Sequence, residues 1–114
     1  EKKLGLMLGQ EDIFVNAAGG IRIDEPAADL AVAISIASSF KNKPVLSDMV
    51  IIGEVGLGGE VRPVSHLEKR LQEAAKLGFK NAMVPLDSAA AVKDTKLRIL
   101  GVRNIREAAE ASMT

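Results

Sequence analysis

The sequence contains no cysteine, no tryptophan and no tyrosine, and it contains a single histidine. Without cysteine the chain has neither a disulfide framework nor thiolate ligands for a metal, and one histidine does not make a typical zinc site. Aromatic residues are only 3% of the chain, so base stacking on aromatic rings is poorly supported and the core must be aliphatic. Lys and Arg balance Asp and Glu at 15 each. Any nucleic-acid binding must therefore come from a local patch rather than from net charge.

The sequence does contain enough apolar material for one domain. The chain has 114 residues, of which 47% are hydrophobic, and this predicts a single domain spanning 1–114. No apolar stretch reaches the length of a membrane span, and the N-terminus does not have the pattern of a signal peptide. We therefore expect a cytoplasmic protein with no membrane partner. Because the chain begins with Glu1 rather than Met, we expect it to be part of a longer protein.

Hydrophobic periodicity and turn residues predict a mixture of strands and helices. After a helical stub, strands are expected at 12–16, 21–23, 50–55, 60–64, 79–85 and 97–100. Helices are expected from Pro26 to about Phe40, from Ser65 to Gly78, over 87–93 and after Asn104. The first of these helices is apolar nearly all round, which is typical of a buried central helix. Hairpins mixed with helices predict an α+β fold in which helices pack on one side of a mixed sheet.

Several polar residues mark the expected helix starts. The adjacent acids Asp24-Glu25 could serve as a general acid and base, but at a helix start caps are the simpler interpretation. The tetrapeptides Ser65–Glu68 and Asn104–Glu107 both have the capping-box pattern, in which two side chains satisfy free backbone N–H groups. His66 has no second histidine or cysteine with which to complete a site, so we expect a surface residue.

The glycine-rich segment Gly56-Leu57-Gly58-Gly59 is expected to be the turn of a hairpin. A phosphate-binding loop leads into a helix and usually carries Lys followed by Ser or Thr. Here the glycines lead into a strand and the lysine is absent, so the sequence predicts no ATP site. The returning strand should place Glu60 and Arg62 on one face.

Two long segments carry a resemblance to a known family. The run V-N-A-A-G-G-I-R-I-D-E-P-A-A-D-L-A occupies 15–31, and the run G-E-V-G-L-G-G-E-V-R-P-V occupies 53–64. Leu67-Glu68 and the run E-A-A-K-L-G-F at 73–79 follow. Together these segments resemble bacterial RadA, also called Sms, a family of DNA repair proteins, over nearly all of residues 1–112. The part matched is the C-terminal Lon-protease-like domain of that family.

The resemblance implies an α+β fold like the proteolytic domain of Lon and like the second domain of a small-subunit ribosomal protein. In the family a zinc finger, a RecA-like ATPase core and the first strands of this domain precede the matched part, so we expect an N-terminally truncated domain. ATP, Mg and Zn are then expected only in those missing N-terminal domains. No cofactor and no metal is expected in this fragment.

The resemblance also implies where protease chemistry would lie. Lon uses a Ser–Lys dyad, and its Asp-Gly-Pro-Ser-Ala-Gly motif falls on 24–29, with Ala27 at the nucleophile position and Glu68 at the lysine position. A methyl group has no oxygen to attack a carbonyl, so this domain is expected to be non-catalytic, although the full-length family is an ATP-dependent DNA-processing enzyme. The alternative is a residual serine peptidase of the Lon class, which would require a serine to leave a buried helix face: Ser35, Ser38 or Ser39.

Two compatible roles remain for such a domain. The first is a scaffold, because Lon-like domains form rings with heterologous contacts, and the full-length protein is expected to be a hexamer. The second is contact with duplex DNA, because the family drives branch migration of recombination intermediates. The expected DNA-binding residues are Arg22 and Arg62, which should project from short strands beside glycine turns. A plain solvated surface is expected on the helix after Ser65, at Lys69, Arg70 and Lys76.

Overall fold

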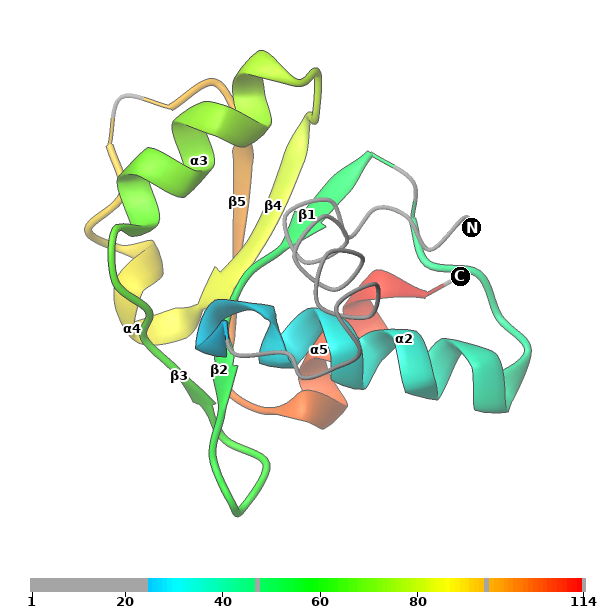
Figure 1. The fold of residues 1–114 in the computed structure, drawn as a ribbon. Helices are drawn as coiled ribbons and strands as arrows, with labels where there is room; N and C mark the ends of the chain where they lie inside the picture. Colours follow the sequence, from blue (N-terminus) through cyan, green and yellow to red (C-terminus); the bar gives the residue numbers. More distant parts are fainter. Residues whose placement is uncertain (1–24, 47, 94, 114) are drawn as a thin grey trace.

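The structure is a computed structural model that describes residues 25–46, 48–93 and 95–113 (Figure 1). The elements in chain order are η2 (Pro26–Ala28), α2 (Asp29–Lys41), β1 (Met49–Ile51), β2 (Glu54–Val55), β3 (Val61–Arg62), α3 (Leu67–Lys76), β4 (Asn81–Pro85), α4 (Leu86–Ala89), β5 (Arg98–Val102) and α5 (Ile105–Ser112). The α+β class predicted from the sequence is confirmed. The stub at 1–9 and the strands predicted at 12–16 and 21–23 lie outside the described residues.

The strands divide into a sheet and a separate hairpin. The sheet is parallel with the order β1-β4-β5, and Ile51 pairs with Met83, which pairs with Leu100. The hairpin joins β2 and β3 antiparallel, with Glu54 opposite Arg62. In Figure 1 the hairpin projects from the body of the molecule below the sheet.

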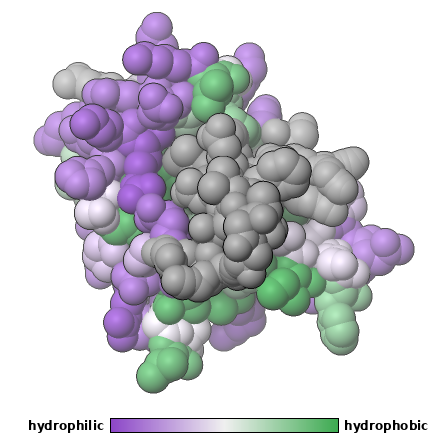
Figure 2. Space-filling model, viewed as in Figure 1, coloured by the Kyte–Doolittle hydropathy of each residue, from purple (hydrophilic) through white to green (hydrophobic). Residues whose placement is uncertain are grey.

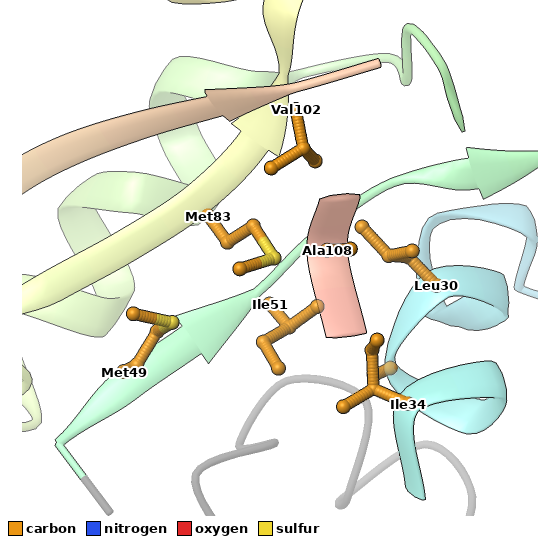
Figure 3. Packing of buried hydrophobic residues seen from close by; sticks show 8 residues of the cluster. Leu30, Ile34, Met49, Ile51, Met83, Val102 and Ala108 are labelled. Carbon is orange, nitrogen blue, oxygen red and sulfur yellow. The ribbon is translucent and has the colours of Figure 1, made fainter. Parts of the chain in front are cut away.

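Helices cover both faces of the parallel sheet. Met49 and Ile51 of β1 belong to a buried cluster with residues of α2 and α5, and Figure 3 shows side chains from these elements meeting over the strands. Val50 and Ile52 belong to a second cluster, with Leu71 and other residues of α3. Because successive side chains of a strand point to opposite faces, both faces bury apolar area. The prediction of helices on one side was therefore wrong.

The strand predicted at 50–55 is interrupted at Gly53. Its N–H donates to the carbonyl of Ala27 at 3.0 Å, and its carbonyl accepts from the N–H of Leu30 at 2.9 Å. A Cβ at this position would lie 2.9 Å from Cγ1 of Val61 and 3.2 Å from Cδ2 of Leu30. The close approach of both Val61 and the helix start therefore favours glycine at this position, where the predicted strand is divided into β1 and β2.

Helix α2 is buried on one face only. Leu30 and Ile34 are fully buried, whereas Ile36 is 63% and Phe40 90% exposed. The prediction of a helix buried all round was therefore wrong, and Figure 2 shows apolar surface over α2. The helix ends where Asn42 adopts the left-handed conformation with φ 55°. None of the helices in the described ranges is long and apolar enough to cross a bilayer.

The two predicted capping boxes have different outcomes. At α5 the side chain of Asn104 accepts from the N–H of Glu107 at 2.8 Å, so the Asn104 cap is confirmed. The Glu107 carboxylate accepts from the N–H of Arg103 at 2.8 Å instead of the N–H of Asn104, so the second half of the box is displaced by one residue. At α3 the N-cap is His66 in the left-handed conformation, and no side chain caps the helix. The box predicted at Ser65–Glu68 was therefore wrong, because the backbone enters α3 by a left-handed turn instead of the extended geometry that a box uses.

Replacing buried and exposed residues of α2 tests the one-sided packing. Leu30→Ala should lower the free energy of unfolding by about 2 to 5 kcal/mol, because it removes buried methyl groups and leaves a cavity. Ile36→Ala on the exposed face should change it by less than about 0.5 kcal/mol. Urea denaturation of the two variants measures the difference, and equal losses would contradict the packing described.

Candidate functional site

Ala27 lies buried at the start of the helical segment. Pro26 opens the turn of η2, and the carboxylate of Glu25 accepts from the N–H of Ala27 at 3.2 Å, which confirms the predicted cap. Asp24, the other predicted cap, lies outside the described ranges. Ala27 is only 5% exposed and packs in the same cluster as Leu71 and Ala74 of α3. Its methyl group offers neither a nucleophile nor a proton acceptor at this position.

Glu68 lies exposed in the first turn of α3. Because the predicted capping box does not form, its carboxylate does not have the structural task that the sequence suggested. It lines a groove together with residues of α3 and of the segment before β5. Near a helix N-terminus the macrodipole stabilises negative charge, so the carboxylate of Glu68 is electrostatically suited to this position.

An ion pair joins the two segments on which the protease dyad would fall. The guanidinium of Arg70 donates from Nη2 to Glu25 Oε2 at 3.0 Å and from Nε to the carbonyl of Ser65 at 2.9 Å. The Arg70 side chain is only 19% exposed and that of Glu25 31%. The prediction of a solvated Arg70 was therefore wrong, because its head group bridges η2 and α3. Such a charge-assisted contact is stronger than a typical surface pair.

The serines considered as substitute nucleophiles lie along α2. Ser38 is buried, and its hydroxyl donates to the carbonyl of Lys43 behind the helix end. Ser35 is half-buried and Ser39 is exposed. A serine nucleophile needs an adjacent base, and no hydrogen bond of the described residues joins one of these hydroxyls to the side chain of a histidine or lysine or to a carboxylate; the bond of Ser38 is to the backbone carbonyl of Lys43.

The hairpin turn holds Glu60 and Arg62 together on one face, as predicted. Glu60 Oε2 accepts from Arg62 Nε at 3.1 Å and from Arg62 Nη2 at 2.9 Å, while Oε1 accepts from the N–H of Gly58 at 3.0 Å. Gly59 has φ 85°, a conformation that favours glycine. Leu57 at the tip is fully exposed, and the Arg62 side chain is 54% exposed. One carboxylate therefore organises the turn and orients the guanidinium.

Two further arginines lie beside this hairpin. The carbonyl of Arg103 accepts from the N–H of Val61 at 2.8 Å, so the segment before α5 runs along β3. Arg103 pairs with Glu107 at 2.8 Å, and this partner raises the pKa of the guanidinium. Arg106 lines a groove with Gly58 and Gly59. Sequence reasoning missed both arginines because only the fold brings 103–106 next to the hairpin. Arg22 lies outside the described residues, so its shared patch with Arg62 stays a prediction.

The acidic and histidine side chains of the described residues are dispersed over the surface elements and do not converge on one point. Within ranges 25–46, 48–93 and 95–113, no three such residues are grouped so that they could hold an ion. His66 is exposed at the start of α3 and lines a shallow groove with Lys69, Arg70 and Glu73. The groove therefore combines three basic side chains with one carboxylate and does not have a ligand set typical of a metal site.

The chain is similar to one protein family and to several bacterial DNA repair proteins. Residues 2–88 match the family described as subunit ChlI of Mg-chelatase. The chain is 48% identical to the DNA repair protein RadA of Listeria monocytogenes over 114 residues, which cover 99% of the chain and 25% of that relative. It is 55% identical to the DNA repair protein RadA of Synechocystis sp. over 85 residues, 75% of the chain and 17% of that relative. The chain thus spans about a quarter or less of the length of these relatives.

The pKa of Glu60 tests the electrostatics of the hairpin. A backbone hydrogen bond at Glu60 and the Arg62 guanidinium lower this pKa below its ordinary value of 4.5. Because the folded-state pKa is depressed, the associated stability is present above about pH 4.5 and is lost as the pH falls through the folded value. NMR titration of the Glu60 carboxyl carbon should give a midpoint below 4.5, and Arg62→Ala should raise it. A midpoint at or above 4.5 in the unmodified chain would contradict the geometry.

Proposed function

This chain belongs to the family described as subunit ChlI of Mg-chelatase and is homologous to bacterial DNA repair protein RadA, and on that basis we propose that it is a non-catalytic domain that serves as a scaffold and contacts duplex DNA. In the whole protein this role would support branch migration of recombination intermediates. ATP, Mg and Zn would act in other parts of that protein. No observation favours the alternative of a residual Lon-class peptidase.

The non-catalytic part of the proposal is supported by the side chains found at the two positions where a Lon-type dyad would lie. Ala27 has a buried methyl group where a Lon-type nucleophile would be, and Glu68 has an exposed carboxylate where the lysine would be. The Glu25–Arg70 ion pair, at 3.0 Å, joins the same two segments in place of a nucleophile and its base. Covalent acyl transfer cannot begin without an activated nucleophile.

The DNA-contact part of the proposal is supported by the exposed arm of the hairpin. Arg62 extends from β3 with 54% of its side chain exposed, and its partner Glu60 is 47% exposed. An ion pair this exposed contributes little to stability, so a phosphate can replace the carboxylate as the acceptor of the guanidinium at little cost. Arg22 is the second proposed contact, and it rests on the sequence pattern alone.

The scaffold part of the proposal is supported by two separate apolar features of the surface. Leu57 is fully exposed at the hairpin tip, and the exposed face of α2 presents Ile36 and Phe40. In Figure 2 apolar surface lies over α2 and at the lower end of the molecule. A ring joins two different patches of each subunit, and a protomer with two unlike apolar features meets that requirement. We propose self-association, as a hexameric ring in the whole protein.

Binding of a fluorescently labelled DNA duplex tests the contact at Arg62. The chain should bind at low salt, and the affinity should fall as salt rises, because cations that contact phosphates release counterions. Arg62→Ala should weaken binding and reduce the slope of log K against log salt by about 1. Lys43→Ala, which removes an exposed positive charge after α2, is the matched control. No binding at low salt, or equal losses in the two variants, would refute the contact.

A further inference from the structure

A groove of about 420 Å³ lies between α3 and the segment that joins α4 to β5. Lys76 from α3 lines one wall, and Lys93 and Lys96 from the joining segment line the other. Among the residues that the structure describes, Glu68 is the one carboxylate of the lining. These described residues bring three ammonium groups and one carboxylate together on a chain whose net charge is zero.

Helix geometry explains one wall of the groove. Glu68, Gln72 and Lys76 are spaced four residues apart, so they lie along one face of α3, and each is exposed. Leu71 and Ala75 contribute apolar surface to the lining. Lysine stems can cover such surface while their charged heads stay at the rim. This wall therefore places the polar ends of its side chains at the rim of the groove and apolar surface at its base.

The opposite wall adds two cations and a hydroxyl. Lys93 and Lys96 are exposed, and Thr95 is half-buried between them in sequence. Thr95 Oγ1 accepts from the N–H of Leu97 at 3.1 Å, which fixes the hydroxyl while leaving its own hydrogen free to be donated. Asp94 of the same segment lies outside the described ranges. The donors on this wall suit an acceptor with several oxygens.

The three lysines have no ionic partner among the residues that the structure describes. The ion pairs there join Glu60 to Arg62, Glu25 to Arg70 and Glu107 to Arg103. Like charges gathered in one groove repel one another, and an anion between them would remove that cost. By contrast, Arg62 and Arg103 on the hairpin side each already have a carboxylate.

We propose that this groove binds a phosphate group, in the chemical class shared by a nucleic-acid backbone and free phosphate. Lys76 would hold one side of the anion, Lys93 and Lys96 the other, and Thr95 would donate a hydrogen bond. The site goes beyond the contact proposed for Arg62, because the hairpin contributes nothing to the lining. Figure 2 shows a largely hydrophilic surface over α3.

NMR titration of the isotope-labelled 114-residue chain tests the site with two probes. Sodium phosphate is added against sodium chloride at constant ionic strength, and a 12-base-pair DNA duplex is added separately. Amide signals of Lys76, Lys93, Thr95 and Lys96 should shift with at least one probe. Shifts with both identify any phosphate as a ligand, and shifts with the duplex alone identify the nucleic-acid backbone.

Two triple variants test whether phosphate binding depends on the three lysines of the groove or only on the net charge of the chain. Lys76→Gln/Lys93→Gln/Lys96→Gln should abolish the groove shifts and reduce the salt slope of duplex binding by about 2 to 3. The control removes three charges elsewhere: Lys41→Gln/Lys43→Gln/Lys69→Gln.

The control should keep the groove shifts. Absent groove shifts with both probes, or equal effects of the two triple variants, would overturn the proposal. Arg62→Ala should leave the phosphate-induced shifts unchanged, so failure of the hairpin contact and failure of the groove are distinguishable.

Discussion

The close approach of Gly53 to the start of the helical segment connects the helices, the sheet and the hairpin at one point. The N–H of Gly53 donates to the carbonyl of Ala27, and the carbonyl of Gly53 accepts from the N–H of Leu30. Two residues further along the chain, the N–H of Val55 donates to Asp29 Oδ2. These bonds tie η2 and α2 to the strand at the point where it leaves the sheet. Ala27 then faces the cluster beneath α3, and Leu30 faces the cluster shared with α5.

This arrangement keeps the fold independent of any chemistry at the dyad positions. The segment at Ala27 is held by backbone bonds and by the Glu25–Arg70 pair, and neither needs a serine or a lysine. Under the proposal of a non-catalytic domain, the fold persists without a catalytic site, because function resides in particular side chains. The features left to support a function are charged side chains on the surface. Arg62 and Arg103 beside the hairpin are paired with carboxylates, whereas the lysines of the groove beside α3 have no ionic partner among the described residues.

Local patterns in the sequence predicted local features well. The Asn104 cap and the Glu60–Arg62 hairpin pair are confirmed because their partners lie two or three residues apart. The failures have tertiary causes. The partner of Arg70 lies 45 residues away, and the break at Gly53 depends on a helix that the strand pattern does not reveal. The lysine groove joins segments distant in sequence, so periodicity could not identify it.

The most direct test of the account is an assay of peptide release from a labelled, unfolded protein substrate. Release should stay at the background level, because neither Ala27 nor Glu68 can replace a member of a Ser–Lys dyad. Replacing Ser35, Ser38 or Ser39 with alanine, one at a time, should change nothing. Release above background that disappears when one of these serines is replaced would contradict the claim that this domain acts through its surface and not through catalysis.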